Sequence, residues 1–392
     1  RLLQRLADAS MPVPAWLAQA LVVAGHSLDT RTLPTSDRAI ALLSELNRCN
    51  SQRPLRADER SDLAERLHGP LFSPEVAVSL CRGLMARDEA QLACRVALSH
   101  WQIAQQVLGT ARAALADARS RMPDVRVRLT GFSSTQRLAE LLAPAFMSFG
   151  RHVIAESTDF GAVIAALTAP VGTPQCLLVL LDVESYFEPD WRSEPGQARE
   201  HFGLRLDALA QAIETHARMH ASQLLINTLP VPTAPTLGHV DAIDPLGMAA
   251  IVRQVNARLV ELASAWPTIQ LVDSDVALAS IPPENRQDAK LWYFGRFAYS
   301  DEATRALASA FASAWFARAG GGVKVIALDF DNTLWGGVFG DDGVGSLQCA
   351  DDFPGNAFQA FQRECLRLKA QGFLLVGLSK NNPDALAVFS DH

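Results

Sequence analysis

Two patterns of hydrophobic positions divide the chain. In residues 1 to about 118, apolar side chains recur at a helical spacing, as in the long stretch from Glu89 to Arg119, and this spacing is typical of amphipathic helices. From Pro123 onward, short apolar runs alternate with segments of helical period. The runs that we expect to be strands are VRVRLTG, HVIAES, QCLLVLLD, QLLINTLP and IQLVDS. Such alternation predicts a mainly parallel sheet covered by helices.

Consecutive glycines at positions 320–322 mark a second change of pattern. They follow the helical segment EATRALASAFASAWFARA and precede a new strand, VKVIALDFD. Because consecutive glycines disfavour both helix and strand, we place a domain boundary there. The sequence therefore predicts a helical region over 1–118, an α/β domain over 119–319 and a further α/β domain over 323–392.

The composition is that of a globular protein with more than one domain. The chain has 392 residues, of which 49% are hydrophobic, and this length suggests two or three domains. The formal charge is -7 and no Lys/Arg-rich run is present, which argues against a nucleic-acid partner. The apolar run PVPAWLAQALVVAG contains two prolines and is shorter than the ~20 residues of a membrane span, so we expect no membrane segment.

The cysteines indicate the cellular compartment of the protein, and the chain ends indicate that the sequence is a fragment. Six scattered cysteines without a CxxC pair indicate neither a disulfide scaffold nor a zinc site, so a cytoplasmic location is expected. The chain begins at Arg1, without an initiating methionine, and stops at FSDH within a predicted helix. We therefore expect that this sequence is part of a longer polypeptide.

Two carboxylates end the first strand of the last domain, in the stretch VIALDFDNTLWGGVFGDDG. Because side chains alternate along a strand, we expect Asp329 and Asp331 to share an orientation while Phe330 points into apolar cover. Two anions at the end of a buried strand need a counter-charge, and Mg²⁺ suits carboxylate oxygens. The alternative is a solvated turn, since Asp, Asn, Thr and Gly are all turn formers. A second strand, FLLVGLS, ends at Ser379 and adds a hydroxyl at the sheet edge, which favours a site.

These residues resemble the motifs of a phosphatase superfamily. DFDNT matches the first motif, DxDxT, of the haloacid dehalogenase-like (HAD) phosphatases, and Ser379 falls at the phosphate-binding Ser or Thr of their second motif. The longer string LDFDNTLWGGVFGDDG, followed by GLSKNN, is similar to the FkbH-like branch, named for its place in polyketide biosynthesis. The resemblance implies a HAD-like Rossmannoid domain of which only the N-terminal part is present, because the lysine and acidic residues of the later motifs normally lie beyond the end of this chain.

The resemblance also implies a role for each matching residue. Asp329 would be the nucleophile that forms an aspartyl-phosphate, and it would ligate Mg²⁺. Asp331 would act as general acid and then as general base, with its main-chain carbonyl on the metal. Thr333 would position Asp331, and Ser379 would hydrogen-bond the phosphoryl group. Lys380 is assigned to the same substrate contact, although it directly follows Ser379 and does not replace the third-motif lysine.

The FkbH-like resemblance implies a substrate and a partner. Proteins of this branch are associated with taking a glyceryl group from 1,3-bisphosphoglycerate, removing its phosphate and loading the group as a thioester on an acyl carrier protein. A protein cysteine can hold the acyl group in transit. Cys349, in the loop after the first motif, is the better candidate, and Cys365 lies in an amphipathic stretch. Both also fit a buried core, where free cysteines are common.

The preceding α/β domain resembles the SGNH-like, flavodoxin-like region found ahead of the phosphatase in longer FkbH-like proteins. GFSST follows its first strand where an SGNH hydrolase carries a GDS motif, so Ser133 aligns with the nucleophile and Phe132 replaces the usual Asp. The closing DxxH motif reads DAKL, with Asp288 present and Leu291 in place of the histidine. Without that base the hydroxyl is a weak nucleophile, and we expect no hydrolase activity. Other candidates to bind a polar ligand, or alternatively to cap and bridge loops, are Ser134, Thr135 and Asn227.

Other functions stay open beside the FkbH-like transferase. A plain HAD phosphatase would act on a free small phosphate ester and need no carrier protein. A docking module would hold a carrier protein without turnover, and an SGNH esterase would depend on Ser133. His216 and His220 are four residues apart on a predicted helix, a spacing compatible with zinc, but no HExxH context supports that site.

Overall fold

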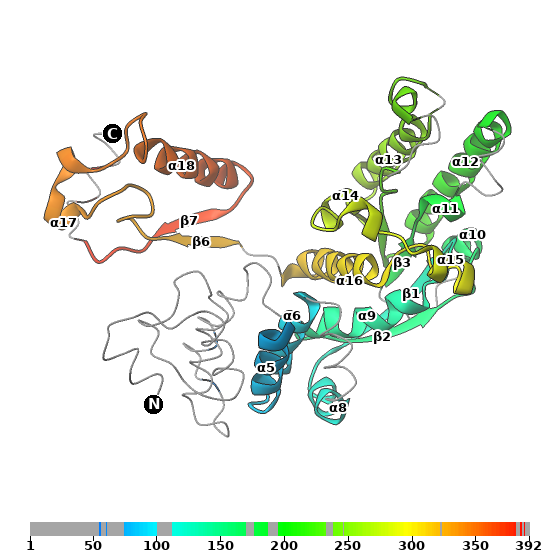
Figure 1. Cartoon of the computed structure of the whole chain (residues 1–392), viewed down its shortest axis with the longest axis horizontal. Coiled ribbons are helices and arrows are strands. Elements are labelled where there is room, and N and C mark those ends of the chain that lie inside the picture. The colour runs from blue at the N-terminus through cyan, green and yellow to red at the C-terminus, as the bar shows by residue number, and fades with distance from the viewer. Residues whose placement is uncertain are drawn as a thin grey trace. The chain divides into compact units, whose positions relative to one another are not determined.

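The computed structural model describes residues 55, 60, 74–99, 112–169, 176–186, 195–232, 238–245, 247–321, 324–381, 385 and 388. The chain forms two compact units, Arg1–Phe316 and Ala317–His392 (Figure 1). The division lies a few residues before the glycines at which we placed a domain boundary. Among them, Gly320 has a φ of 86°, a backbone conformation that favours glycine. The helical patterns expected before Pro74 and across 100–111 lie outside the described residues.

The described part of the first unit is built on a five-stranded parallel sheet with the order β2-β1-β3-β4-β5. The strands are β1 (Asp124–Gly131), β2 (His152–Ser157), β3 (Cys176–Leu180), β4 (Gln223–Asn227) and β5 (Ile269–Val272). They lie within or next to the five predicted runs, so the predicted parallel α/β fold is confirmed. The order is the flavodoxin-like one, in which the chain changes its direction across the sheet between β1 and β3.

Helices cover both faces of this sheet (Figure 1). One face is covered by α9 (Gln136–Met147) and α16 (Asp301–Phe316), the other by α10 (Val163–Thr168), α12 (Pro195–Met219) and α13 (Met248–Ala265). In β3, Leu178 belongs to the core on the α9 side and Leu177 to the core on the α12 side. All five residues of β3 are buried, because a sheet covered on both faces has no solvent side.

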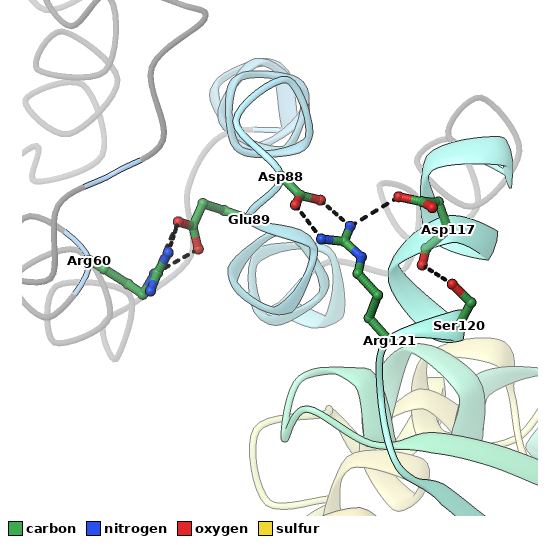
Figure 2. A network of polar contacts seen from close by, with 6 residues as sticks. All are labelled: Arg60, Asp88, Glu89, Asp117, Ser120 and Arg121. Carbon is green, nitrogen blue, oxygen red and sulfur yellow. Dashed lines mark hydrogen bonds and ion pairs between the residues drawn. The ribbon is translucent and has the colours of Figure 1, made fainter.

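The described residues between 74 and 120 are mostly helical, as predicted. The helices are α5 (Pro74–Met85), α6 (Ala90–Ser99) and α8 (Arg112–Ser120). Figure 2 shows the ion pairs around them: the guanidinium of Arg121 binds both carboxylate oxygens of Asp88 at 2.5 Å and reaches Asp117 at 3.1 Å. Arg60 pairs with the buried carboxylate of Glu89. The contacts of Arg121 link the end of α8 to the turn between α5 and α6.

Hydrogen bonds also join these helices to the layer beside the sheet. Gln91 and Arg95 of α6 donate to the carbonyl of Ser148, at the end of α9, over 3.2 and 3.1 Å. Arg305 of α16 donates to the carbonyl of Leu98. The described helices of the N-terminal region therefore belong to the same compact unit as the sheet. Shorter elements of this unit are α11 (Val183–Tyr186), α14 (Ser274–Ala277), α15 (Ala289–Gly295), η2 (Gly238–Ala242) and η3 (Pro283–Asn285).

The second unit has the predicted order of strand, loop, helix and strand. Its elements are η4 (Ala317–Gly321), β6 (Val325–Leu328), α17 (Phe339–Asp342), η5 (Val344–Ser346), α18 (Gly355–Ala370) and β7 (Leu374–Gly377). β6 and β7 pair in parallel, with Leu328 opposite Gly377. The expectation of a buried first strand is wrong: Val325 is 50% exposed, because β7 is the only described partner of β6 and neither strand is fully covered.

Within the described residues, no helix has both the length and the apolar character that crossing a membrane requires.

Candidate active site

Asp331 lies just beyond β6 and is held by three hydrogen bonds. Its Oδ1 accepts from the indole Nε1 of Trp335 at 3.0 Å and from the backbone N of Phe339 at 3.1 Å. Its Oδ2 accepts from Nδ2 of Asn381 at 2.8 Å. Partial burial acts to raise the pKa of Asp331, but the three donors outweigh it and hold that pKa below its usual range. The carboxylate is therefore fixed in position and favoured in its charged form.

The turn after β6 explains how these donors reach one carboxylate. Asn332 adopts a left-handed conformation with a φ of 54°, which Asn tolerates better than most residues, and its Oδ1 accepts from the backbone N of Gly337 at 3.0 Å. The reversed chain brings Trp335 back beside Asp331, and its ring packs 5.5 Å from that of Phe330. The predicted apolar cover of Phe330 is confirmed, since this side chain is 8% exposed.

Asp329 faces a different environment from Asp331. Its side chain is exposed, and Oδ1 accepts from the backbone N of Phe330 at 2.8 Å. Within the described residues Oδ2 of Asp329 has no hydrogen bond, so this oxygen is available to a ligand. Both carboxylates lie just beyond the end of the strand, but Asp331 accepts three hydrogen bonds from the protein and Asp329 accepts one. Their common orientation stays a prediction.

The oxygen atoms at this edge fit a Mg²⁺ ion. Both side-chain oxygens of Asp331 accept N–H bonds, so a metal contact of this residue would come through its main-chain carbonyl. Asp329 would supply a carboxylate oxygen. No cluster of three or more His, Cys, Asp or Glu side chains suited to a metal occurs among the described residues. Mg²⁺ is nevertheless commonly held by one or two carboxylates together with waters and substrate phosphates.

The second predicted motif reaches the first through Asn381. Ser379 and Lys380 are both exposed, and Oγ of Ser379 accepts from the backbone N of Asn381 at 3.1 Å. The substrate contacts of Ser379 and Lys380 stay predictions. The turn from Ser379 to Asn381 is nevertheless brought to Asp331, because the side chain of Asn381 bonds that carboxylate.

Sequence reasoning missed Trp335 and Asn381 and assigned the positioning of Asp331 to Thr333. Thr333 is half-buried, and its backbone N donates to the carbonyl of Phe330 at 3.2 Å. Within the described residues, no hydrogen bond joins the Thr333 hydroxyl to Asp331, so that role stays a prediction. The signals available in the sequence were a tryptophan four residues after Asp331 and an asparagine two residues after Ser379.

Cys349 lines a cavity of about 920 Å³ between the small sheet and α18. Nε2 of Gln362 lies 3.1 Å from the Cys349 sulfur, and Nε2 of Gln359 donates to the Cys349 carbonyl at 2.8 Å. Cys365 also lines this cavity but is buried, and burial together with Glu364 raises the pKa of its thiol. The geometry therefore favours Cys349 over Cys365 as an accessible thiol.

In the first unit, the segment that carries the DxxH-like residues lies against the turn after β1. The backbone N of Ser134 donates to the carbonyl of Arg296 at 2.9 Å. Asp288 caps α15 by accepting from the backbone N of Lys290 at 2.8 Å, and Leu291 lies on that helix. Ser133 is 1% exposed and has no described hydrogen bond to a histidine. The expected absence of hydrolase activity stays a prediction.

Asn227 bridges loops at the end of β4. Its side chain accepts from the backbone N of Leu181 at 2.7 Å and donates to the carbonyl of Leu181 and to Oγ of Ser274, each at 2.9 Å. With its amide engaged in this way, the bridging interpretation of Asn227 is confirmed.

The histidine pair of α12 is part of the packing. His216 is buried, and its Nδ1 lies 3.3 Å from the carbonyl of Leu167. Its ring lies 4.9 Å from that of His220. Burial, with a further contribution from His220, lowers the pKa of His216. A zinc site here gains no support, since no third ligand of the described residues joins the pair.

Comparison with known proteins identifies a structure of similar fold. It is the N-terminal part of the protein BF1531 from Bacteroides fragilis, which contains a phosphatase domain and is complexed with Mg. The two chains are 20% identical and superpose with a TM-score of 0.58 over 68% of this chain and 73% of that chain. No protein family model and no curated protein matches the sequence. The chain thus shares its α/β fold with this phosphatase-containing structure.

Proposed function

We propose that the protein is a Mg²⁺-dependent phosphatase of the HAD type with Asp329 as its nucleophile. The observation that carries this proposal is the 2.8 Å hydrogen bond from Asn381 to Asp331, because it joins the segments that follow two parallel strands. Ligands of α/β sheets bind beyond the carboxyl ends of the strands. The phosphatase domain with Mg in the similar Bacteroides structure supports the same interpretation.

The residues at this edge have complementary tasks in the proposed reaction. Oδ2 of the exposed Asp329 attacks phosphorus, forming an aspartyl-phosphate as the bond to the leaving oxygen breaks and that oxygen takes a proton from the protonated form of Asp331. Asp331 then takes a proton from the water that hydrolyses this intermediate, and its charged form suits that step. Ser379 and Lys380 hydrogen-bond the phosphoryl oxygens. When bound at Asp329 and the Asp331 carbonyl, Mg²⁺ supplies positive charge to the phosphoryl group.

In its finer form, the proposal is a glyceryl transfer from 1,3-bisphosphoglycerate to the thiol of an acyl carrier protein. The Cys349 sulfur, as thiolate, attacks the acyl carbon, a thioester forms, and the C1 phosphate leaves with the electron pair of the broken C–O bond. The C3 phosphate ester is then cleaved through Asp329 and water, which leaves a glyceryl thioester. The carrier thiol then displaces Cys349. Support comes from the FkbH-like string around Asp329 and from the cavity of about 920 Å³ that Cys349 lines, which lies within the usual size range of small-molecule sites.

One experiment distinguishes phosphatase activity from glyceryl transfer to a carrier protein. The protein is incubated with Mg²⁺, 1,3-bisphosphoglycerate and holo carrier protein, and the intact mass of the carrier and the release of phosphate are measured. We expect a glyceryl adduct that is lost in Asp329→Asn and Cys349→Ala and kept in the control variants Asp341→Asn and Cys365→Ala. Phosphate release without an adduct on the carrier would support the phosphatase activity and contradict the glyceryl transfer. Carrier binding without any turnover would favour the docking module.

A further inference from the structure

We propose that Gln362 is a positioning residue for the Cys349 thiol, to which it donates a hydrogen bond in the cavity that both residues line. Gln362 lies on α18, and its Nε2 is 3.1 Å from Sγ of Cys349. This role rests on the proposed function, in which Cys349 carries the acyl group. The donor stabilises the sulfur as an anion, the form in which it attacks and in which it leaves.

A second contact fixes which end of the Gln362 amide faces the sulfur. Nε2 of Gln362 also donates to the carbonyl oxygen of Leu334 at 2.5 Å. A carbonyl oxygen only accepts, so the NH₂ group of the amide, and not its oxygen, must lie on this side. An amide NH₂ group has two hydrogens, and Leu334 uses one of them. The other hydrogen is available to the sulfur, which is therefore the acceptor.

The backbone keeps Cys349 within reach of this donor. Gly336 and Gln348 exchange two backbone hydrogen bonds, of 3.1 and 2.8 Å, so the residue before Cys349 is paired with the loop that follows β6. On the other side, a Cβ atom added to Gly355 would lie 2.4 Å from the backbone N of Ala350. The segment that carries Cys349 is thus packed against the start of α18.

A neighbouring glutamine of α18 holds the main chain of Cys349 instead of its sulfur. Nε2 of Gln359 donates to the Cys349 carbonyl at 2.8 Å, and Oε1 of Gln359 accepts from Arg363 at 3.1 Å. Within the described residues, Gln362 is the hydrogen-bond donor to the sulfur. The two glutamines therefore provide a matched pair of contacts with one cysteine, of which one reaches the reacting atom.

A hydrogen bond to the sulfur matters because both steps of the proposed transfer place negative charge on it. Donors bind an anion more strongly than a neutral acceptor, so the amide favours the thiolate over the thiol. The charged side chains that line the same cavity are Asp351 and Arg363. Both are exposed and their charges are opposite, which leaves the amide as the directional contact. Through Leu334 the same amide also ties the thiol to the turn that holds Asp331.

The alkylation rate of Cys349 tests this role without substrate, metal or carrier protein. The whole chain is treated with iodoacetamide between about pH 6 and pH 10, and the modified peptide is followed by mass spectrometry. Gln362→Met keeps the length of the side chain and removes the donor. We expect the pH of half-maximal rate to rise by about one unit, the effect of one hydrogen bond to a charged group. Near neutral pH the rate should fall only about 3-fold, because a thiolate without the donor is more nucleophilic.

Gln359→Met is the matched control, since it removes a hydrogen bond to the main chain of Cys349 and keeps the donor to the sulfur. Its pH of half-maximal rate should equal that of the wild type. A loosened loop would speed alkylation at every pH, so faster alkylation of Gln362→Met would contradict the role. An unchanged pH of half-maximal rate in Gln362→Met, or the same rise in Gln359→Met, would also contradict it.

Glyceryl transfer to the carrier is measured in the same variants, so that the two proposals fail in different ways. We expect the adduct to form about 3-fold more slowly in Gln362→Met than in the wild type, in line with its alkylation. The expected alkylation profile without an adduct in any chain would support the hydrogen bond and contradict the acyl transfer. A wild-type profile and a wild-type rate of adduct formation in Gln362→Met would contradict the role of Gln362 and support the transfer.

Discussion

At the residue scale, the environment of Asp331 shows how one carboxylate is held in place and in its charged form. Trp335 and Phe339 come from the turn that follows it, while Asn381 comes from the segment after β7. The donors act together because each favours the charged form. Asp329, two residues earlier, keeps an oxygen free of described hydrogen bonds. The two carboxylates of one motif therefore differ in their hydrogen bonding, because Asp331 is held by three donors and Asp329 keeps one oxygen available.

Replacing Asn381 tests the role of its hydrogen bond. Asn381→Ala removes the donor to Oδ2, so Asp331 should be less well oriented and its pKa should rise. We expect kcat of phosphate release to fall about 10-fold, the effect of losing one hydrogen bond to a charged group, with a smaller change in KM. Steady-state kinetics measure this. Asn356→Ala, on the exposed side of α18, is the matched control, and an unchanged kcat in Asn381→Ala would contradict the role.

His216 predicts a pH dependence of stability. Because burial lowers its folded pKa below the unfolded value of about 6.5, the unfolded chain binds the proton more tightly. The contribution of His216 to the free energy of unfolding is therefore complete above about pH 6.5 and is lost as the pH falls from there toward the folded pKa. Denaturant unfolding of wild type and His216→Gln across this range measures it. A pH slope that is the same in both chains would contradict the assignment.

At the element scale, hydrophobic patterning located the strands better than it judged their burial. The five runs of the first sheet were recognisable because parallel strands covered on both faces are apolar nearly throughout. β6 reads VIAL, a sequence as apolar as β3, yet its residues are exposed or only half-buried. Burial depends on which elements cover a strand, and that information lies in long-range contacts.

The same limit applies to the candidate site. The apolar run that ends just before Asp329 was enough to predict that Asp329 and Asp331 lie at the end of a strand. The contact of Asn381 with Asp331 depends on the pairing of Leu328 with Gly377, and a register between strands almost 50 residues apart cannot be read from local pattern. Trp335 reaches Asp331 through a turn in which Asn332 adopts a left-handed conformation. Asn is common in this conformation but also occurs in others, so the turn could not be predicted from the sequence.

Gly377 lets the ends of β6 and β7 approach one another. A Cβ atom at this position would lie 2.6 Å from two ring atoms of Phe330, so Gly377→Ala should displace that ring and with it the turn that holds Asp331. We expect the second unit to lose about 1–3 kcal/mol of stability, measured by denaturant unfolding. Gly345→Ala, where the added atom meets nothing within 4 Å, is the control. Equal stability of both variants would contradict the packing argument.

At the scale of the whole molecule, the chain joins a three-layer α/β unit to a smaller α/β unit that carries the candidate active site. The boundary lay where glycines interrupt the helical pattern, and composition alone could place it because glycine has a strong local effect. The helices between Pro74 and Ser120 were predicted as a separate region. Their contacts with α9 and α16 place the described part of them in the first unit.

Limited proteolysis tests this division. Cleavage is expected first around Gly320, since the chain leaves the helical conformation there and the segment joins two compact units. Mass spectrometry of the products should reveal a resistant fragment that ends close to Phe316. Initial cleavage within α9 or α16 instead would contradict the assignment of the two units.

The most direct test of the account is to look for the phosphoryl group on its proposed acceptor. The protein is mixed with Mg²⁺ and acetyl phosphate, quenched in acid, digested and analysed by mass spectrometry. The account predicts one phosphoryl group on the peptide that contains Asp329, reduced when Mg²⁺ is chelated and absent in Asp329→Asn. Phosphate release with no modification of Asp329, or equal release by Asp329→Asn, would contradict it.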